Sequence, residues 1–241
     1  LAGEGNDTVV YTGGGNSYTL TDHVENISVD ELYGYNFETT LTGNAQDNVI
    51  DGSGGYINRG GTTLDGGVGA DTMIGRSSVA DTYYVDNVGD SVIEKDVGVT
   101  SGRDSVYTTI SYSLSSQIEN LTLLGDSGIS GTGNASNNIL DGSQNFAANV
   151  LTGGQGNDTY LVHPNDTVVE AANEGTDLVK AYSSYTLSNN VENLWLYVGG
   201  VGIGNDQNNE IRNSGFEAFT VLDVRGGNDL LIGVGNVYDT Y

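Results

Sequence analysis

Apolar residues at every second position recur in short segments along the chain, and they indicate β-strands. Leu121 with Leu123 and Leu194 with Leu196 are examples, and the spacing fits a strand because its successive side chains point to opposite faces. Clusters of Gly, Asn and Asp, which favour turns, interrupt these segments about every eight to ten residues. No stretch holds a helical period beyond two turns. The pattern therefore predicts an all-β chain of short strands joined by tight turns.

The strand and turn pattern repeats along the chain. A Ser-Tyr-(Thr/Ser)-Leu segment is followed, seven residues after its Tyr, by the Glu of a (Val/Ile)-Glu-Asn-(Ile/Leu) segment. The three Tyr and Glu positions are Tyr18 and Glu25, Tyr112 and Glu119, and Tyr185 and Glu192. Acidic positions also recur between the second and third repeats of this pattern: Asp90 and Glu94 match Asp166 and Glu170, and Asp104 matches Asp177. Repetition of this kind predicts a single repeat array over residues 1–241, with units of roughly 1–80, 81–157 and 158–238. Since the chain opens and closes inside a unit, we expect it to be an excerpt of a longer chain.

Four nine-residue segments follow one glycine-rich template. Two are complete, Gly66–Ile74 (GGVGADTMI) and Gly153–Leu161 (GGQGNDTYL), and two depart from it only at the start, Ala2–Val10 (AGEGNDTVV) and Val224–Ile232 (VRGGNDLLI). Glycine permits a positive φ, so such a turn can direct several backbone carbonyls toward one point, and the aspartate that follows adds a carboxylate. The residues predicted to bind metal in these turns are Asp7, Gly66, Gly67, Gly69, Asp71, Gly153, Gly154, Gly156, Asp158 and Asp229.

These segments resemble the G-G-x-G-x-D-x-U-x nonapeptide of RTX (hemolysin-type) calcium-binding repeat proteins, where U is a large apolar residue. The resemblance implies a right-handed parallel β-solenoid of the β-roll type, Ca²⁺ as the cofactor, and secretion by bacteria into a calcium-rich medium. In RTX-like rolls, neighbouring coils share ions, which suggests that Asp71 and Asp90 form one ligand pair. Some turns of this chain carry Asn where Asp is expected, namely at Asn48, Asn138 and Asn209, so we expect those turns to be free of metal.

The charge of the chain narrows the choice of partners. Asp and Glu number 32 against 7 Lys and Arg, for a formal net charge of −25. This acidity argues against nucleic acid and against insertion into anionic membranes, whereas cations between the carboxylates would relieve the repulsion. The chain has no cysteine, which excludes disulfides and thiolate metal sites.

Other residue types carry weaker signals. The two histidines, His23 and His163, have no nucleophile arrangement attached, so we expect no enzymatic activity. The glutamates and asparagines of the repeated Glu-Asn segments are interpreted as solvated and structural residues respectively. The tyrosines and Trp195 would fit a sugar-binding stripe, although strand packing explains such residues more often.

The sequence thus favours a calcium-binding structural repeat module of an extracellular bacterial surface protein, adhesin or filament. One alternative is the calcium-dependent carrier region of a type I-secreted enzyme, and another is a solenoid that binds polysaccharide or a surface. Self-association through the open solenoid ends is a further expectation.

Overall fold

The computed structural model describes residues 5–12, 17–29, 38–54, 60–95, 102–213 and 220–233. These residues are all-β and contain no helix, and their strands stack in parallel as a β-solenoid. The expected all-β solenoid of short strands and turns is therefore confirmed. The chain divides into two compact units, Leu1–Ile110 and Ser111–Tyr241.

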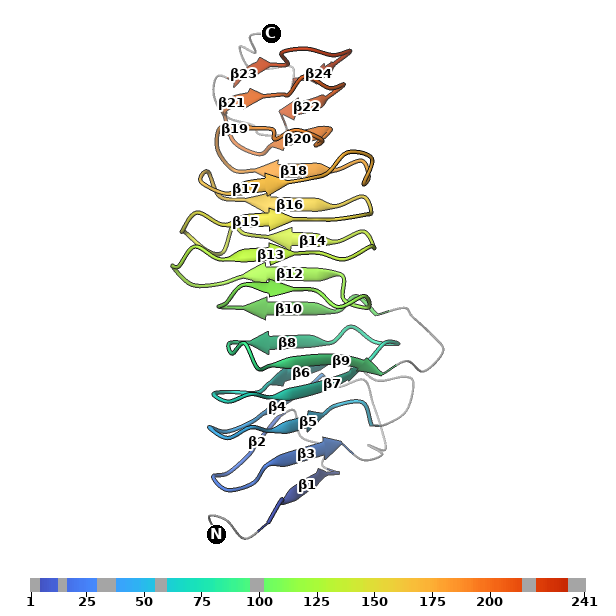
Figure 1. The fold of residues 1–241 in the computed structure, drawn as a ribbon, viewed down its shortest axis with the longest axis vertical. Coiled ribbons are helices and arrows are strands. Elements are labelled where there is room, and N and C mark those ends of the chain that lie inside the picture. The colour runs from blue at the N-terminus through green and yellow to red at the C-terminus, as the bar shows by residue number, and fades with distance from the viewer. Residues whose placement is uncertain are drawn as a thin grey trace. The chain divides into compact units, whose positions relative to one another are not determined.

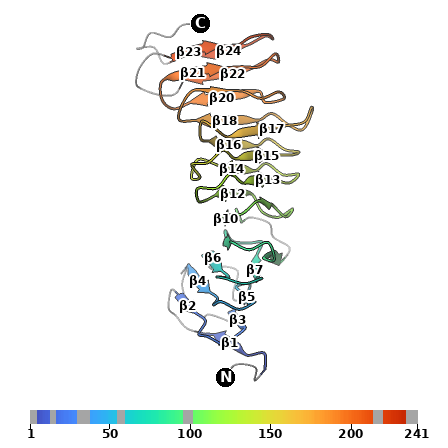
Figure 2. The same cartoon turned by 60° about the vertical axis from the view of Figure 1, so that its left-hand side comes forward.

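In the first unit, odd-numbered and even-numbered strands form two separate rows (Figures 1 and 2). The odd strands make a five-stranded parallel sheet in the order β1-β3-β5-β7-β9, and the even strands follow the order β2-β4-β6-β8-β10. The odd row contains β1 (Thr8–Tyr11), β3 (Asn26–Val29), β5 (Val49–Asp51), β7 (Thr72–Arg76) and β9 (Ser91–Lys95). The even row contains β2 (Ser17–Thr19), β4 (Thr39–Thr42), β6 (Thr62–Asp65), β8 (Thr82–Val85) and β10 (Ser105–Thr108).

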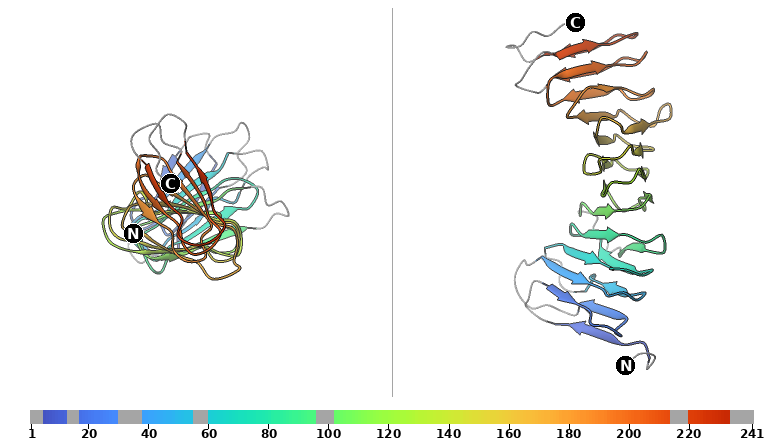
Figure 3. Two further views of the ribbon diagram at one scale, coloured as in Figure 1. Left: turned by 90° about the horizontal axis from the view of Figure 1, so that it is seen from above. Right: turned by 90° about the vertical axis from the view of Figure 1, so that its left-hand side faces the viewer.

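The second unit also consists of stacked strands (Figure 3), but its odd strands form two shorter sheets. The even row contains β12 (Asn120–Leu123), β14 (Ile139–Asp141), β16 (Thr159–Val162), β18 (Leu178–Ala181), β20 (Asn193–Leu196), β22 (Glu210–Asn213) and β24 (Leu230–Ile232). The four-stranded odd sheet contains β11 (Tyr112–Ser113), β13 (Ser130–Thr132), β15 (Val150–Thr152) and β17 (Thr167–Val169). The three-stranded odd sheet contains β19 (Tyr185–Thr186), β21 (Gly200–Ile203) and β23 (Thr220–Asp223).

Apolar residues at equivalent positions of successive strands form the core between the two rows. In the first unit Ile27, Ile50 and Met73 lie in register on β3, β5 and β7 and are fully buried. In the second unit Leu140 and Tyr160 hold the equivalent register on β14 and β16. The alternation seen in the sequence thus places one face of every strand in the core, and stacking in register makes that core continuous from coil to coil within each unit.

The Ser-Tyr-(Thr/Ser)-Leu segments mark the places where rows of strands begin. Tyr112 lies on β11 and Tyr185 on β19, and these strands open the two odd sheets of the second unit. Tyr185 is buried at the break between β17 and β19, where its hydroxyl donates to the Asp166 carbonyl at 3.3 Å. The coil that contains β19 is short: its Asp177 to Glu192 hydrogen bond spans 15 residues, whereas that from Asp158 to Asp177 spans 19. A cavity of about 320 Å³ lies at the break, lined by Thr167, Ser184 and Ile203 among others.

Candidate metal centres

A ladder of hydrogen bonds links the residues that precede strands in neighbouring coils. In each rung, the side-chain oxygen of one residue accepts the backbone N–H of the equivalent residue in the preceding coil. The Asn138 N–H donates to Asp158 Oδ1 at 2.7 Å, the Asp158 N–H to Asp177 Oδ1 at 2.8 Å, and the Asp177 N–H to Glu192 Oε2 at 2.8 Å. In the first unit the Asn48 N–H donates to Asp71 Oδ1 at 2.7 Å. Each of these aspartates therefore uses one oxygen to hold the preceding coil.

Two groups of three carboxylates lie inside the solenoid, one group in each unit. We call Asp81, Glu94 and Asp104 the first triad, and Asp158, Glu170 and Asp177 the second triad. In each triad one oxygen from every residue lies within 4.8 Å of the other two, and all six side chains are buried. The two triads occupy equivalent places, because one aspartate directly precedes β8 or β16 and another directly precedes β10 or β18. The glutamate comes from the end of the intervening strand, β9 or β17.

The second triad contains buried oxygen atoms that no donor reaches. Asp158 Oδ2 and Glu170 Oε2 are inaccessible to solvent and make no hydrogen bond. The other oxygen of Glu170 accepts the Tyr160 hydroxyl, and the carboxylate also accepts the backbone N–H of Gly153. Buried polar atoms almost always have a hydrogen-bond partner. These two oxygens have none and are therefore candidate ligands for a cation. The first triad has a tyrosine of its own in the equivalent place, because the Tyr83 hydroxyl donates to Glu94.

Each triad lies against one glycine, and a larger residue would not fit there. A Cβ on Gly153 would overlap the Tyr160 hydroxyl and Asp158 Oδ2, and would lie 2.5 Å from Glu170 Oε1. A Cβ on Gly75 would overlap the Tyr83 hydroxyl and would lie 2.6 Å from Asp81 Oδ2. Gly153 is the first residue of a complete nonapeptide, whereas Gly75 comes directly after one. Both glycines leave the space in which the carboxylates converge.

The electrostatics of the second triad favour a bound cation. Burial first, and then the neighbouring charges of Asp177, Asp158 and Glu174, together raise the pKa of Glu170 to about 8. Burial first, and then Asp177 and Glu174, likewise raise the pKa of Asp158 to about 6. The pKa of Asp177 is also raised, first by burial and then by Glu192 and Glu174. These shifts arise because the carboxylates face one another away from water, and a cation among them would remove both penalties.

The complete nonapeptide turns adopt the backbone that the sequence predicted. Gly67 and Gly69 have φ of 75° and 147°, and Gly154 and Gly156 have φ of 91° and 121°. In the near match that begins at Val224, Arg225 takes the second position with φ of 59°. The conformation of this turn is therefore kept where a side chain replaces the glycine.

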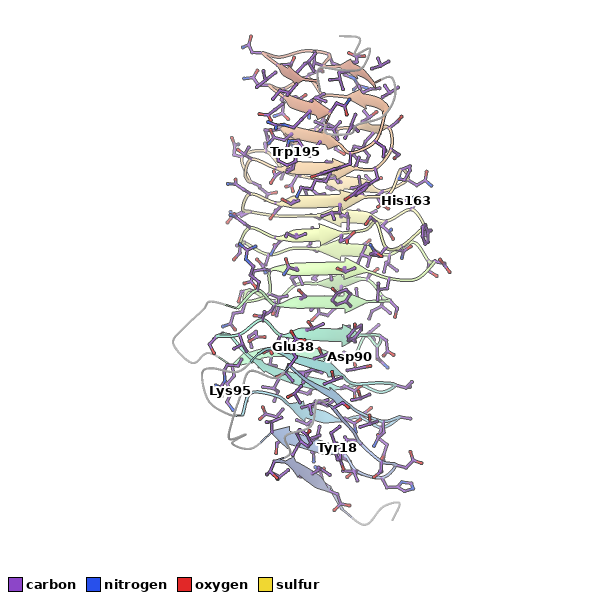
Figure 4. The ribbon with its side chains drawn as sticks, turned by 180° about the vertical axis from the view of Figure 1, so that it is seen from behind. Tyr18, Glu38, Asp90, Lys95, His163 and Trp195 are labelled. Atoms are coloured by element: carbon purple, nitrogen blue, oxygen red, sulfur yellow. The ribbon has the colours of Figure 1, made fainter. Side chains whose placement is uncertain are left out.

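The predicted ligand pair Asp71 and Asp90 lies in adjacent coils of the first unit. The Asp71 N–H donates to Asp90 Oδ1 at 3.0 Å, and Asp90 Oδ2 accepts the N–H groups of Asp86 and Asn87. Asp90 directly precedes β9 and Lys95 ends it, so their labels mark the two ends of that strand in Figure 4. Asp71 is fully buried, its Oδ2 makes no hydrogen bond, and burial raises its pKa to about 6. Among the described residues, however, no third carboxylate joins this pair as closely as in the triads.

The remaining predicted ligands lie farther from any convergence of carboxylates. Asp7 is exposed and its N–H donates to Glu25 Oε2 at 2.8 Å, while residues 2–4 of its nonapeptide lie outside the described part of the chain. Asp229 is partly buried and accepts the Asn209 N–H at 2.8 Å. Each aspartate takes part in a rung of this kind within its own unit, and the structure places neither in a triad.

Asparagine amides satisfy the turns that lack the glycine–aspartate pattern. Asn134 Nδ2 donates to the Ser115 and Ile118 carbonyls, each at 2.7 Å, and its N–H donates to Asn138 Oδ1 at 2.7 Å. Asn44 with Asn48, and Asn205 with Asn209, repeat this arrangement. In each case an amide N–H group binds carbonyls of the corresponding turn in the preceding coil.

The repeated Glu-Asn segments clamp the preceding coil. Glu192 accepts the N–H of Asp177 at 2.8 Å, and Asn193 Nδ2 donates to the carbonyl of the same Asp177 at 3.0 Å. Glu25 and Asn26 hold Asp7 in the same way. Asn26 and Asn193 thus have the predicted structural role, and Glu25 and Glu192 are partly exposed, as expected of solvated side chains, but each also accepts a backbone N–H from the preceding coil.

Five triad residues were not among the residues predicted to bind metal: Asp81, Glu94, Asp104, Glu170 and Asp177. The sequence did contain a signal for them, since the same acidic positions recur in both units. That recurrence did not reveal a metal centre, because the glutamate lies on a strand of the opposite row and no glycine motif surrounds it. Only the coil geometry brings it to the two aspartates.

Trp195 and several tyrosines lie on outward-facing positions of the second unit. Lys180 Nζ lies 5.7 Å and Arg212 Cζ 5.2 Å from the centroid of the Trp195 ring, and they come from the strands on either side of β20. Tyr182 and Tyr197 stack with their centroids 5.2 Å apart. Figure 4 labels Trp195 on this face and His163 at a turn. Because cations already flank the indole ring, a sugar would have to displace one of them to stack there.

Comparison with protein-family models, with curated proteins and with solved structures gives no match for this chain. Among the described residues, no helix is long and apolar enough to span a membrane.

Proposed function

We propose that the chain is a calcium-binding structural repeat module of an extracellular bacterial surface protein, such as an adhesin or a filament. The observation that carries the proposal is the pair of equivalent buried triads, in which carboxylate oxygens converge, two of them in the second triad, Asp158 Oδ2 and Glu170 Oε2, without a hydrogen bond. Carboxylate oxygens are hard ligands, and calcium accepts six to eight oxygens in variable geometry. The proposal involves no catalytic residue.

The structural role follows from where the triad residues lie. In the second triad, Asp158 and Asp177 come from neighbouring coils, and Glu170 directly follows β17, the strand between them. An ion held by all three would close one coil against the next. Since ion binding and coil closure would then be the same event, calcium would contribute directly to folding.

An extracellular location is supported by the resemblance of the nonapeptides to RTX repeats and by the calcium supply outside cells. The net charge of −25 also opposes folding unless cations are bound. Both arguments favour a protein that folds after it meets calcium.

The proposal is tested by circular dichroism of the full chain, first freed of metal with a chelator and then titrated with calcium. We expect the β signal to increase with calcium and to saturate, and magnesium to be much less effective because it demands a smaller octahedral site. Full β structure in the chelator, unchanged by millimolar calcium, would rule out the proposed role.

Two substitutions test whether the response to calcium comes from the second triad. Glu170→Gln removes one charge from the second triad, and Asp126→Asn is the matched control, since Asp126 is exposed and belongs to neither triad. We expect only the first variant to need more calcium.

A further inference from the structure

The second triad carries more negative charge than one calcium ion neutralises. Asp158, Glu170 and Asp177 contribute three carboxylates, and their side chains are 1 %, 7 % and 1 % exposed. The other charges that act on them, from Glu174 and Glu192, are also negative. With all three carboxylates ionised as ligands, a divalent ion would leave the centre with a net negative charge in a place that water does not reach, and uncompensated buried charge is unfavourable.

We propose that the second triad binds trivalent rare-earth ions more tightly than calcium, because three positive charges match its three buried carboxylates. This inference rests on the proposed function, since it requires the triad to be a metal centre. Two further observations support a real ligand site: the unpartnered oxygens Asp158 Oδ2 and Glu170 Oε2, and the space that Gly153 keeps open beside them. Rare-earth ions are hard and prefer oxygen ligands, as calcium does.

Tyr160 provides a way to locate the bound ion. Its hydroxyl donates to Glu170, so its ring lies next to the triad. Excitation of a tyrosine this close to terbium is transferred to the ion, which then emits. Tyr83 has the same relation to the first triad, and Tyr160→Phe therefore identifies the part of the emission that comes from the second triad while all three carboxylates remain.

The experiment uses the full chain, freed of metal by a chelator. Terbium is added until its tyrosine-sensitised emission saturates, and calcium is then titrated to displace it. We expect calcium to displace terbium only at a concentration well above that of terbium, and we expect Tyr160→Phe to lose the emission of the second unit. The ratio of the calcium to the terbium dissociation constant measures the preference.

The charge argument is tested by Asp177→Asn, which keeps the shape of the side chain and removes one charge. We expect the preference for terbium to fall by about tenfold or more, because a unit charge within a few ångströms of the ion acts more strongly on a trivalent than on a divalent ion. Asp126→Asn should leave the ratio unchanged. Should Asp177→Asn fail to fold, Glu174→Gln replaces it, since Glu174 acts on all three carboxylates from outside the triad, and we expect a smaller fall in the same direction.

The possible failures are distinguishable. If neither calcium nor terbium binds, the proposed function itself is overturned, and this inference with it. If calcium binds but terbium binds no more tightly, or if the ratio is the same in the wild type, Asp177→Asn and Glu174→Gln, the preference for trivalent ions is overturned and the calcium proposal stands. If Tyr160→Phe keeps all the emission, the ion is not at the second triad.

Discussion

The two carboxylate oxygens of Asp158 have different contacts. Oδ1 accepts the backbone N–H of Asn138 in the preceding coil, and Oδ2 converges with Glu170 and Asp177 without any hydrogen bond. The first oxygen holds the coil in place and the second is left for a cation. A substitution at this site therefore affects two properties, and the residues around it are needed to separate them.

Gly153→Ala should weaken calcium binding without removing a ligand. The added methyl group would overlap the Tyr160 hydroxyl and Asp158 Oδ2, so these groups must move away from the ion. Overpacking of this kind costs about 1–3 kcal/mol. Calorimetric titration with calcium would measure the loss. Gly226→Ala is the matched control, because a Cβ there meets its nearest neighbour at an ordinary 3.5 Å, and an equal loss in both variants would contradict the role of Gly153.

The ion-free chain should lose order as the pH rises. The pKa of Glu170 is raised from 4.5 to about 8 and that of Asp158 from 3.8 to about 6, so the folded state binds protons that the unfolded state has released. This stabilisation is complete below the unfolded values and is lost as the pH rises through the folded ones. Circular dichroism in a chelator should therefore show less β structure at about pH 8 than at about pH 5, and calcium should restore it at the higher pH.

Glu170→Gln separates this effect from the general repulsion of an acidic chain. The amide cannot take up the proton, so the dependence on pH in the chelator should become weaker. A dependence as strong as that of the wild type would show that other carboxylates are responsible.

At the scale of turns, the coils fall into two kinds. Glycine–aspartate turns leave a buried carboxylate oxygen without a partner, as at Asp71 and Asp158. In asparagine turns the amide donates to carbonyls of the preceding coil, as Asn134 does to Ser115 and Ile118. Only the first kind should respond to calcium.

Asn134→Ala should destabilise the chain equally with and without calcium. It removes two hydrogen bonds to the Ser115 and Ile118 carbonyls, one exposed and one part-buried, and each typical hydrogen bond contributes about 0.5–1.5 kcal/mol. Urea denaturation in calcium and in partly depleted calcium would measure both values. The exposed Asn189 provides the control Asn189→Ala, and a loss for Asn134→Ala that disappears at high calcium would show that its turn binds the ion.

Strands and turns could be predicted from the sequence because their signals are local. The alternation around Leu194 and the glycines at Gly154 and Gly156 each act within a few residues, and the structure places them as predicted. Glu170 could not be identified in this way, since it meets Asp158 and Asp177 only after the chain has completed a coil. The break between β17 and β19 could not be predicted either. It coincides with one coil that is shorter than its neighbour, and no particular residue type marks it.

At the scale of the whole molecule, the chain contains two compact units, each with one triad. Glu170→Gln should remove one ion from the total and leave the centre of the first unit intact. Calorimetry should count one bound ion fewer than in the wild type. Limited proteolysis in calcium should then cleave the second unit and spare the first, and protection of both units would contradict independent centres.

The spacing of Asp158 and Asp177 has a mechanical consequence. The two residues are 19 positions apart along the chain but adjacent in space, so a pull on the chain ends cannot unwind that coil without drawing them apart. An ion between them would carry part of the load. The force needed to extend the molecule would then depend on the calcium concentration around it, and the array would behave as a spring whose stiffness is adjusted by the surrounding medium.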